Sequence, residues 1–406
     1  MITDKNYFKG KELAVVGAGT AGVISVLHSL RLPGEINIKW YYDPNKKPVS
    51  VGEGSQVAFP EHLAVTFGFD LGDIKNKLDG SVKLGIEKIN WGDGNDFKHN
   101  FIMPYHAIHF NANKTQDYVL SNLTNEKLEI IDKAVTADDI NADWIIDCTG
   151  APSNFDECNI LDNIPVNKAY IVQAEHNQEK QTIDSTLCIA RPFGWVFIVP
   201  LANRYSIGYI FNSDITPDED IKKDVEEVYK YIPVKPNVET GFIPFKNYIR
   251  KENFTYNKAY NGNASFFMEP IEATSQGNIF WINQSFNEIM GQPADFERWN
   301  QLYTTEMLWS EMIINLHYLA GSKWNNDFWN EAYKKALVSV DKIKDDRYYE
   351  AWKKIVDHKE MDTLECVLDM AAKAGGIGQW NTMSWHQNLK GLNVRSKLQK
   401  IINNEN

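Results

Sequence analysis

The feature that most constrains the fold is a glycine-rich turn between two apolar segments near the start of the chain. Residues 12–32, ELAVVGAGTAGVISVLHSLRL, combine an apolar run, the turn and a helical pattern. Gly17, Gly19 and Gly22 complete G-x-G-x-x-G at the junction of the predicted strand and the predicted helix. Glycines there let the backbone approach a pyrophosphate, which the helix N-terminus stabilises. The turn predicts an α/β dinucleotide-binding fold with a helix over residues 20–31.

A second predicted strand supports the same site. Residues 36–44, INIKWYYDP, are rich in β-branched and aromatic side chains and end near Asp43. An acidic residue about 20 positions after the glycine turn is expected to meet a ribose hydroxyl. We therefore expect the dinucleotide to contact Thr20 and Ala21 in the turn, together with the three glycines and Asp43.

The rest of the chain predicts two connected parts. Residues 1–290 are expected to form a cofactor-binding and catalytic domain, with an antiparallel substrate-side sheet from about 81–110 and 185–260. Residues 291–406 are expected to be mainly helical and to pack on that domain, because Trp, Tyr, Leu and Lys recur at helical spacing. One such helical stretch covers residues 346–376 and ends at a glycine pair.

A third strand is predicted over residues 141–153, NADWIIDCTGAPS. It ends in a turn at Thr149–Gly150, a position that ordinary turn chemistry also explains. In flavoproteins of this layout a late strand with such an ending returns to the first sheet. We therefore expect Asp147 and Gly150 to lie near the cofactor.

Charge and cysteine content exclude several classes of protein. The net charge of −12 argues against nucleic acid or an anionic membrane as a partner, because both would be repelled. The cysteines have no ligand spacing, which argues against zinc and favours a reducing cytoplasm. Glycines interrupt the apolar N-terminal run, so it does not resemble a signal peptide. His106 and His109 have no third ligand nearby, and no metal is expected. The cysteines are Cys148, Cys158, Cys188 and Cys366.

A lysine stands in a predicted strand at residues 81–91, SVKLGIEKINW. Val82, Leu84 and Ile86 alternate as in a half-buried strand, and Lys83 lies between them. From this segment alone, the simplest interpretation is that Lys83 faces water.

Six further segments look like parts of one enzyme family. They are SVGEGS (50–55), KLGI followed by NW (83–91), PYHAI (104–108), GWVFIVP (194–200), FFMEPIEATS (266–275) and HYLAGSKWNNDFW (317–329). Together with the glycine turn they resemble the flavin-dependent tryptophan halogenases, and the likeness extends to about residue 330. The chain would be a compact member, and phage genomes as well as bacteria carry such enzymes.

This resemblance implies a Rossmann-type FAD-binding domain of the flavin monooxygenase/halogenase kind with a mostly helical C-terminal portion. It implies that reduced FAD, dioxygen and halide produce hypohalous acid, which Lys83 passes to an aromatic small molecule. Glu272 would pair with Lys83 and take up the proton that the arene releases. The other implied site residues are Glu53, Gly54, Asp147 and Gly150 for FAD, His106, Ile108 and Trp195 for the substrate, and Thr274 and Ser275 for halide.

The chain departs from the family pattern at four positions and in length. In the W-x-W-x-I-P signature Phe197 replaces the second Trp and Val199 replaces the Ile; further on, Ala273 replaces a Ser and Ser275 replaces a Gly. An FAD-dependent aromatic hydroxylase and a catalytically silent flavin-binding protein are the alternatives that these changes leave open. The short chain predicts an open pocket, and the altered halide segment predicts use of bromide or iodide as well as chloride. A single dinucleotide motif implies a separate flavin reductase, and a homo-oligomer is compatible with the sequence.

Overall fold

The computed structural model describes residues 7–93, 95–101, 105–176, 183–291, 295–358 and 376–403. Pro104, Cys366 and residues 359–375 of the expected helical stretch lie outside these described residues.

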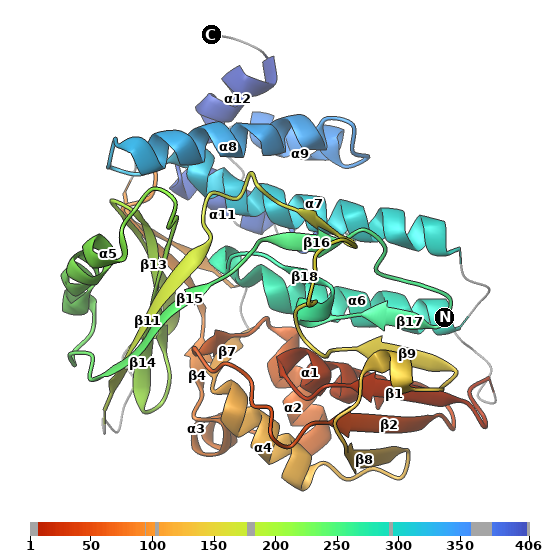
Figure 1. Cartoon of the computed structure of the whole chain (residues 1–406). Helices are drawn as coiled ribbons and strands as arrows, with labels where there is room; N and C mark the ends of the chain where they lie inside the picture. The colour runs from red at the N-terminus through yellow and green to blue at the C-terminus, as the bar shows by residue number, and fades with distance from the viewer. Residues whose placement is uncertain are drawn as a thin grey trace.

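A five-stranded parallel sheet carries the glycine turn (Figure 1). It consists of β1 (Glu12–Val16), β2 (Asn37–Tyr42), β8 (Leu128–Asp132), β9 (Trp144–Asp147) and β17 (Lys258–Tyr260). The order is β17-β9-β1-β2-β8, and every neighbouring pair is parallel. Val15 of β1 lies between Trp40 of β2 and Ile146 of β9. The predicted α/β fold is confirmed, and the third predicted strand returns to the same sheet.

Helix α1 (Thr20–Ser29) packs on this sheet, α2 (Ala58–Phe67) and α4 (Ala112–Asn122) contact α1, and α3 (Leu71–Leu78) contacts α4. The helix expected over residues 20–31 is α1, which ends two residues earlier. Seven of its ten residues are buried, so α1 is apolar on almost every side. It packs against the first two strands and against α6 (Thr274–Met290), which brings the end of the predicted first domain back to the nucleotide turn.

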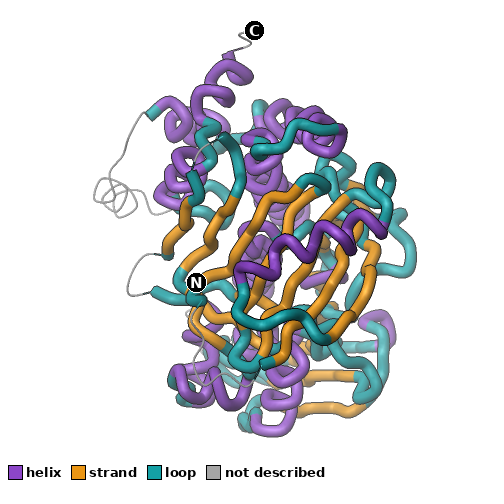
Figure 2. Tube along the Cα trace, turned by 90° about the vertical axis from the view of Figure 1, so that its left-hand side faces the viewer, coloured by secondary structure: helices purple, strands orange, loops and turns teal. Residues whose placement is uncertain are grey.

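A second sheet of seven strands stands beside the first. It consists of β5 (Gly85–Ile89), β6 (Phe97–Asn100), β11 (Lys168–Glu175), β12 (Ser185–Arg191), β13 (Gly194–Pro200), β14 (Arg204–Phe211) and β15 (Val238–Pro244). The order is β15-β11-β14-β13-β12-β5-β6. Figure 2 shows this sheet with a helical segment running across its strands. That segment comprises α5 (Asp218–Asp224) and η2 (Val225–Tyr231), whose Ile221, Val225 and Val228 are buried against the sheet.

The expected antiparallel substrate-side sheet differs from this one in two respects. The pair β12–β5 is parallel, because a long crossover through other elements separates the two strands. In addition, β4 (Ser81–Lys83) and β7 (Ala107–Phe110) leave the large sheet and pair with β3 (Glu53–Gly54) in the order β3-β7-β4. Lys83 therefore ends a strand of the small sheet, and β5 begins two residues later in the large one.

The remaining elements connect the sheets to a helical layer. A third small sheet contains β10 (Cys158–Ile160), β16 (Tyr248–Arg250) and β18 (Phe266–Phe267), and short 3₁₀ turns are η1 (Ala137–Asp139), η3 (Gly262–Ala264) and η4 (Ile271–Ala273). The helices after α6 are α7 (Phe296–Ala320), α8 (Asp327–Ile343), α9 (Tyr349–Asp357), α11 (Thr382–Gly391) and α12 (Arg395–Asn403).

The helical layer shares one hydrophobic core with the parallel sheet. A continuous cluster of buried apolar side chains extends from Phe8 to Ile402 and includes Trp195, Trp309 and Trp385. Helix α11 also contacts the edge strand β6 of the large sheet. Among the described residues, no helix is long and apolar enough to cross a membrane.

Candidate active site

Two of the three glycines in the turn are required by close packing. Gly17 has a φ of +109°, and a Cβ there would lie 2.3 Å from the carbonyl oxygen of Cys148. A Cβ on Gly22 would lie 2.0 Å from the carbonyl oxygen of Gly17. Both distances are far shorter than any real contact, so a larger residue would push α1 away from the sheet.

The middle glycine faces open space instead. No atom lies within 4 Å of the place where a Cβ on Gly19 would be. Gly19 is the N-cap of α1 and provides no side-chain cap for the helix. Thr20 and Ala21 begin the helix, and Ala21 packs closely against Gly262 of η3. An uncapped helix N-terminus beside open space suits a pyrophosphate, so these residues fit the FAD that the sequence implies.

The predicted acidic contacts lie at the carboxyl ends of parallel strands, where α/β proteins bind their ligands. Asp43 follows β2 directly, and its Oδ1 accepts a hydrogen bond of 2.9 Å from the backbone N–H of Asn45. Asp147 ends β9, and its Oδ1 accepts bonds from the backbone and the hydroxyl of Thr149. A cavity of about 320 Å³ opens beside Asp147 and Gly150. The side chains are in place for a nucleotide, and their contact with it stays a prediction.

Glu53 is tied to a helix. Its Oε2 accepts a 3.0 Å hydrogen bond from the backbone N–H of Ala112, the first residue of α4. Burial raises the pKa of Glu53 to about 8. This bond gives Glu53 a structural role at the start of α4, and its contact with flavin stays a prediction. Gly54 follows, and its missing Cβ would lie 3.0 Å from the Lys83 Nζ.

Lys83 is buried, with 1% of its surface exposed. The interpretation that Lys83 faces water is therefore wrong. Its Nζ lies 3.4 Å from the carbonyl oxygen of Ser55 and 5.6 Å from the centre of the Phe101 ring. Burial lowers the pKa of Lys83 to about 8, which makes the free amine accessible near neutral pH. Lys83 thus stands directly beside the segment 53–55 that the resemblance places next to the flavin.

Glu272 occupies a strained turn and carries the densest set of polar contacts in the site. Both Glu272 and Ala273 have left-handed backbone angles, with φ of +62° and +53°. One carboxylate oxygen, Oε1, accepts a hydrogen bond from the Lys88 Nζ and lies 3.5 Å from the His317 Nε2. The other, Oε2, lies 2.8 Å from the His99 Nδ1. Such strain persists only where the surroundings hold the turn in place.

The electrostatics of this cluster favour an ionised carboxylate. Burial by itself would raise the pKa of Glu272, but Lys88, His99 and His317 outweigh it and hold that pKa well below its usual range. Burial and the neighbouring Lys88 lower the pKa of His317 to about 4. A neutral His317 ring donates from Nδ1 to the carbonyl oxygen of Ile313 and accepts at Nε2 from Lys88, at 2.8 Å.

The predicted pairing of Lys83 with Glu272 is wrong as a direct contact. The lysine that touches Glu272 is Lys88, five residues further along. Lys83 and Lys88 belong to different sheets, separated at Leu84, and both side chains reach the interior from these two sheets. Glu272 acts on Lys83 at longer range, where it works against the lowered pKa of that lysine.

Four polar residues of this cluster carry no signal that we recognised in the sequence. His99 lies on β6, Lys88 on β5, His317 near the end of α7 and Ser384 on α11. Each stands alone among its sequence neighbours, and only the tertiary fold brings the four together. The available hints were that Lys88 lies in the family-like segment 83–91 and that His317 begins the family-like segment 317–329.

The predicted substrate residues do not form one surface. Trp195 is fully buried, and its Nε1 donates a 2.7 Å hydrogen bond to Glu269, whose pKa burial raises to about 8. Ile108 is buried in the main core, and its backbone holds Ser55 in place through two hydrogen bonds. His106 is half-buried just before β7. Their contact with a substrate stays a prediction.

The predicted halide residues begin helix α6. Ala273 is its N-cap and provides no side-chain cap. Within the described part of the chain, the Thr274 Oγ1 is buried and has no hydrogen-bond partner, and Ser275 follows on a less buried side. A buried hydroxyl without a partner at an uncapped helix N-terminus fits a small anion.

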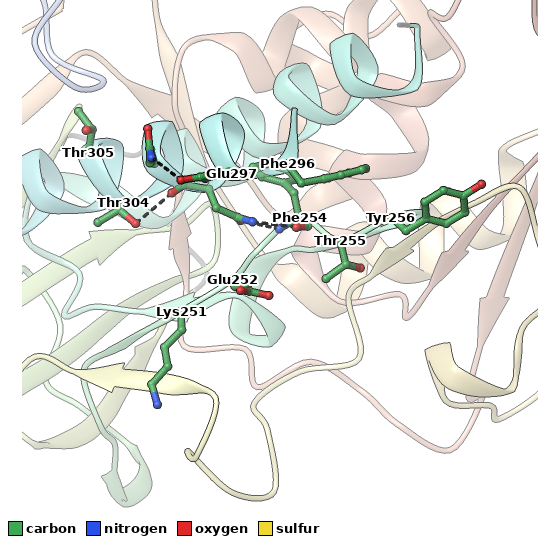
Figure 3. A pocket seen from close by; sticks show the side chains of 11 residues that line it. Lys251, Glu252, Phe254, Thr255, Tyr256, Phe296, Glu297, Thr304 and Thr305 are labelled. Carbon is green, nitrogen blue, oxygen red and sulfur yellow. Dashed lines mark hydrogen bonds between the residues drawn. The ribbon is translucent and has the colours of Figure 1, made fainter. Parts of the chain in front are cut away.

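A larger cavity of about 770 Å³ lies elsewhere on the molecule (Figure 3). It is formed between the loop before β17 and the first turns of α7, with Phe254, Tyr256 and Phe296 among its lining residues. None of the residues predicted for cofactor, substrate or halide lines it. The described residues also contain no group of three or more His, Cys, Asp or Glu able to hold a metal ion.

The parallel sheet, the glycine turn and the open helix N-terminus define a dinucleotide-binding α/β protein with a buried Lys–Glu–His cluster. Residues 106–401 match the family model described as Tryptophan halogenase. The chain therefore belongs to the tryptophan halogenase family.

Individual relatives are distant. The 7-chloro-L-tryptophan 6-halogenase KtzR of Kutzneria sp. (strain 744) is 23% identical over 51% of this chain and 42% of its own length. The tryptophan 7-halogenase RebH of Lentzea aerocolonigenes is 20% identical over 83% of this chain and 81% of its own length. The crystal structure of a tryptophan halogenase from Shewanella frigidimarina superposes with a TM-score of 0.73 at 17% identity, covering 99% of this chain and 94% of that one. The match thus spans less than half of the first relative, and the last comparison establishes the fold alone.

Proposed function

We propose that this protein is an FAD-dependent halogenase that transfers halogen to an aromatic small molecule. The observation that carries the proposal is the buried Lys83, which stands beside segment 53–55 and lies within electrostatic reach of the ionised Glu272. Burying a lysine costs free energy, because its charge is poorly solvated in the protein interior. A role in the reaction explains such a position better than stability does. Family membership and the fit of the glycine turn to FAD support the same conclusion.

When bound, reduced flavin together with dioxygen and halide supplies hypohalous acid. Lys83 then has two properties that suit halogen transfer. Its pKa of about 8 leaves a free amine that can take up electrophilic halogen, and its burial keeps water away from the reactive group. Glu272, held ionised, accepts the proton that the arene loses when the carbon–halogen bond forms.

The halide site is proposed at the start of α6. The uncapped N-terminus of that helix and the unpartnered hydroxyl of Thr274 both favour an anion. Ser275 in place of the family's glycine alters the turn, and we propose that bromide and iodide are accepted as well as chloride.

The proposed substrate is an electron-rich aromatic compound in an open pocket. The chain is short, and the residues proposed to line the pocket come from two places in the fold, with His106 and Ile108 at the start of β7 and Trp195 on β13. We propose that bulky indoles and phenols are accepted and that free tryptophan is not specially preferred. A flavin reductase would deliver reduced FAD by diffusion. The described cysteines are free and buried, which is consistent with action in a reducing cytoplasm.

The test is to supply the purified protein with a flavin reductase, FAD and NADH, and with chloride, bromide or iodide in separate reactions. An indole and phenol panel that includes free tryptophan is added, and products are identified by mass. Halogenated products that depend on Lys83 are the expected result. Products that carry oxygen instead would establish the aromatic hydroxylase, a reaction that the Phe197 replacement makes the natural alternative. Reaction of free tryptophan alone would contradict the open pocket.

A further inference from the structure

Helix α11 reaches the carboxylate of Glu272 through one histidine. The Ser384 Oγ lies 3.0 Å from the His99 Nε2, and the His99 Nδ1 lies 2.8 Å from the Glu272 Oε2. His99 is buried, with 4% of its surface exposed, and Ser384 is half-buried in the first turn of α11. Ser384 is separated from His99 by 285 residues and comes from the far end of the chain. The arrangement is therefore a tertiary contact that the C-terminal helix brings to the site.

The direction of these hydrogen bonds follows from the charge of Glu272. An ionised carboxylate can only accept hydrogen bonds, so the His99 Nδ1 must carry a proton. In a neutral ring the Nε2 is then an acceptor, and the Ser384 hydroxyl donates to it. Ser384 thus adds to the preference, set by Glu272, for the tautomer in which His99 donates to the carboxylate.

We infer that Ser384 is a positioning residue for the halogenase reaction, acting on Glu272 through His99; this inference rests on the proposed function. Lys88 holds the Oε1 side of the carboxylate, and among the described residues His99 is the group that holds the Oε2 side. Without the Ser384 hydroxyl, Glu272 alone disfavours the Nε2-protonated tautomer, and where that tautomer forms its Nδ1 lone pair faces the Oε2 lone pairs. The carboxylate would then turn away from the orientation in which it accepts the arene proton.

The same three side chains occur in the triads of serine hydrolases, but two features argue against a nucleophilic role here. The backbone N–H of Ser384 donates to the side chain of Asn381, and the N–H of Trp385 donates to the Asn381 carbonyl oxygen. The N–H groups next to the hydroxyl are thus occupied, and neither can stabilise an oxyanion. In addition, Lys88 binds the remaining oxygen of Glu272. These contacts favour orientation over acyl transfer.

Three variants test this role. Ser384→Ala removes the hydroxyl, and Ser384→Thr retains it. Gln387→Ala is the matched control, because Gln387 lies one turn further along α11 and bonds to the backbone of Asn100, the residue after His99, without touching the cluster. The ¹⁵N shifts of the histidine rings report the tautomer directly in the purified protein, and halogenation kinetics with a reductase report kcat and KM.

We expect Ser384→Ala to convert the His99 ring from one tautomer to a mixture and to lower kcat by roughly 10- to 100-fold, the range typical when an orienting partner is lost. KM for the arene should stay unchanged, because Ser384 is argued to act on proton transfer through His99 and Glu272. Ser384→Thr should restore both signals, and Gln387→Ala should change neither.

The inference is overturned if Ser384→Ala and Gln387→Ala give the same ring shifts and the same kcat. It is also overturned if the wild-type protein hydrolyses nitrophenyl esters and Ser384→Ala abolishes that activity. Failure of the wild type to halogenate any arene would refute the proposed function instead, and the ring shifts would still decide whether Ser384 sets the tautomer.

Discussion

Replacing Lys88 with Met should expose the electrostatic cost of burying Glu272. Met has nearly the length of lysine and fills the same space, so the main change is loss of the ammonium group. Lys88 and Glu272 are both buried with no side-chain exposure, and their ion pair holds the pKa of Glu272 well below 4.5. Removing one partner of a buried pair typically costs about 3–5 kcal/mol, because the other charge remains without compensation. We therefore expect the free energy of unfolding at pH 7 to fall by about that amount.

The pH dependence gives the sign of the effect. In the wild type the depressed pKa of Glu272 contributes stability that is present above the unfolded value and is lost as pH falls through the folded one. In Lys88→Met the folded pKa of Glu272 should rise, because the largest opposing cation is gone. Protonation then relieves the unpaired charge, so the difference in stability between variant and wild type should shrink as pH falls below neutrality.

The measurement is denaturant unfolding of both proteins from pH 4 to pH 8, with Lys98→Met as the control. Lys98 lies on the neighbouring strand and pairs at 2.8 Å with the exposed Asp184, so its loss should cost only about 0–1 kcal/mol at any pH. The double variant Lys88→Met/Glu272→Gln should be more stable than the sum of the two single changes predicts, because neither charge is left alone. An additive double variant, or a Lys88→Met protein as stable as the wild type at pH 7, would refute the buried pair.

Three further predictions concern the cofactor, the lysine and the halide. Gly19→Val should fill the open space before α1 and abolish FAD binding in a protein that still folds, as measured by flavin fluorescence; normal binding would place the nucleotide elsewhere. Lys83→Ala should keep FAD binding and flavin oxidation but lose halogenated product by roughly a thousandfold or more. Lys83→Arg should lose nearly as much product, because guanidinium cannot form a haloamine. Glu272→Gln should reduce product formation less than either lysine variant. Wild-type product formation should rise as pH passes through about 8 and the Lys83 amine loses its proton, and a flat profile would argue against the amine. In halide competition, bromide or iodide should be used at least as well as chloride because Ser275 reshapes the site beside Thr274, and a clear preference for chloride would contradict this.

Local signals predicted the nucleotide-binding half of the fold well. The run ELAVV, the glycine turn and the acid after the second strand lie close together in sequence, and β1, α1 and β2 form where these signals stand. The order of the strands in the sheet was harder to predict from the sequence. β17 joins the sheet beside β9 from more than a hundred residues away, and its three residues carry no pattern of their own. The parallel β12–β5 pair could not be predicted from local sequence either, since the pairing of distant strands depends on how the whole core packs.

Lys83 illustrates how far a local pattern reaches. An alternating strand leaves the residue between its apolar positions facing the other side, and for an isolated sheet that side is water. Here β4 pairs with β7, the central strand of the small sheet, and the Lys83 side chain is buried with its Nζ near the carbonyl oxygen of Ser55. The resemblance to the halogenase family pointed to a buried role for Lys83, whereas the strand pattern alone could not.

The two lysines differ in what their surroundings allow them to do. Lys88 lies between the carboxylate of Glu272 and the ring of His317, so two of its three N–H donors are committed to these groups. Within the described residues, Lys83 has one carbonyl contact at 3.4 Å and an aromatic ring beside it, and its pKa of about 8 makes a lone pair available near neutral pH. A group that receives halogen needs the lone pair of a free amine. A group that keeps a carboxylate ionised must instead carry a proton and a positive charge. This contrast favours Lys83 as the residue that transfers halogen and Lys88 as the residue that keeps Glu272 ready to accept a proton.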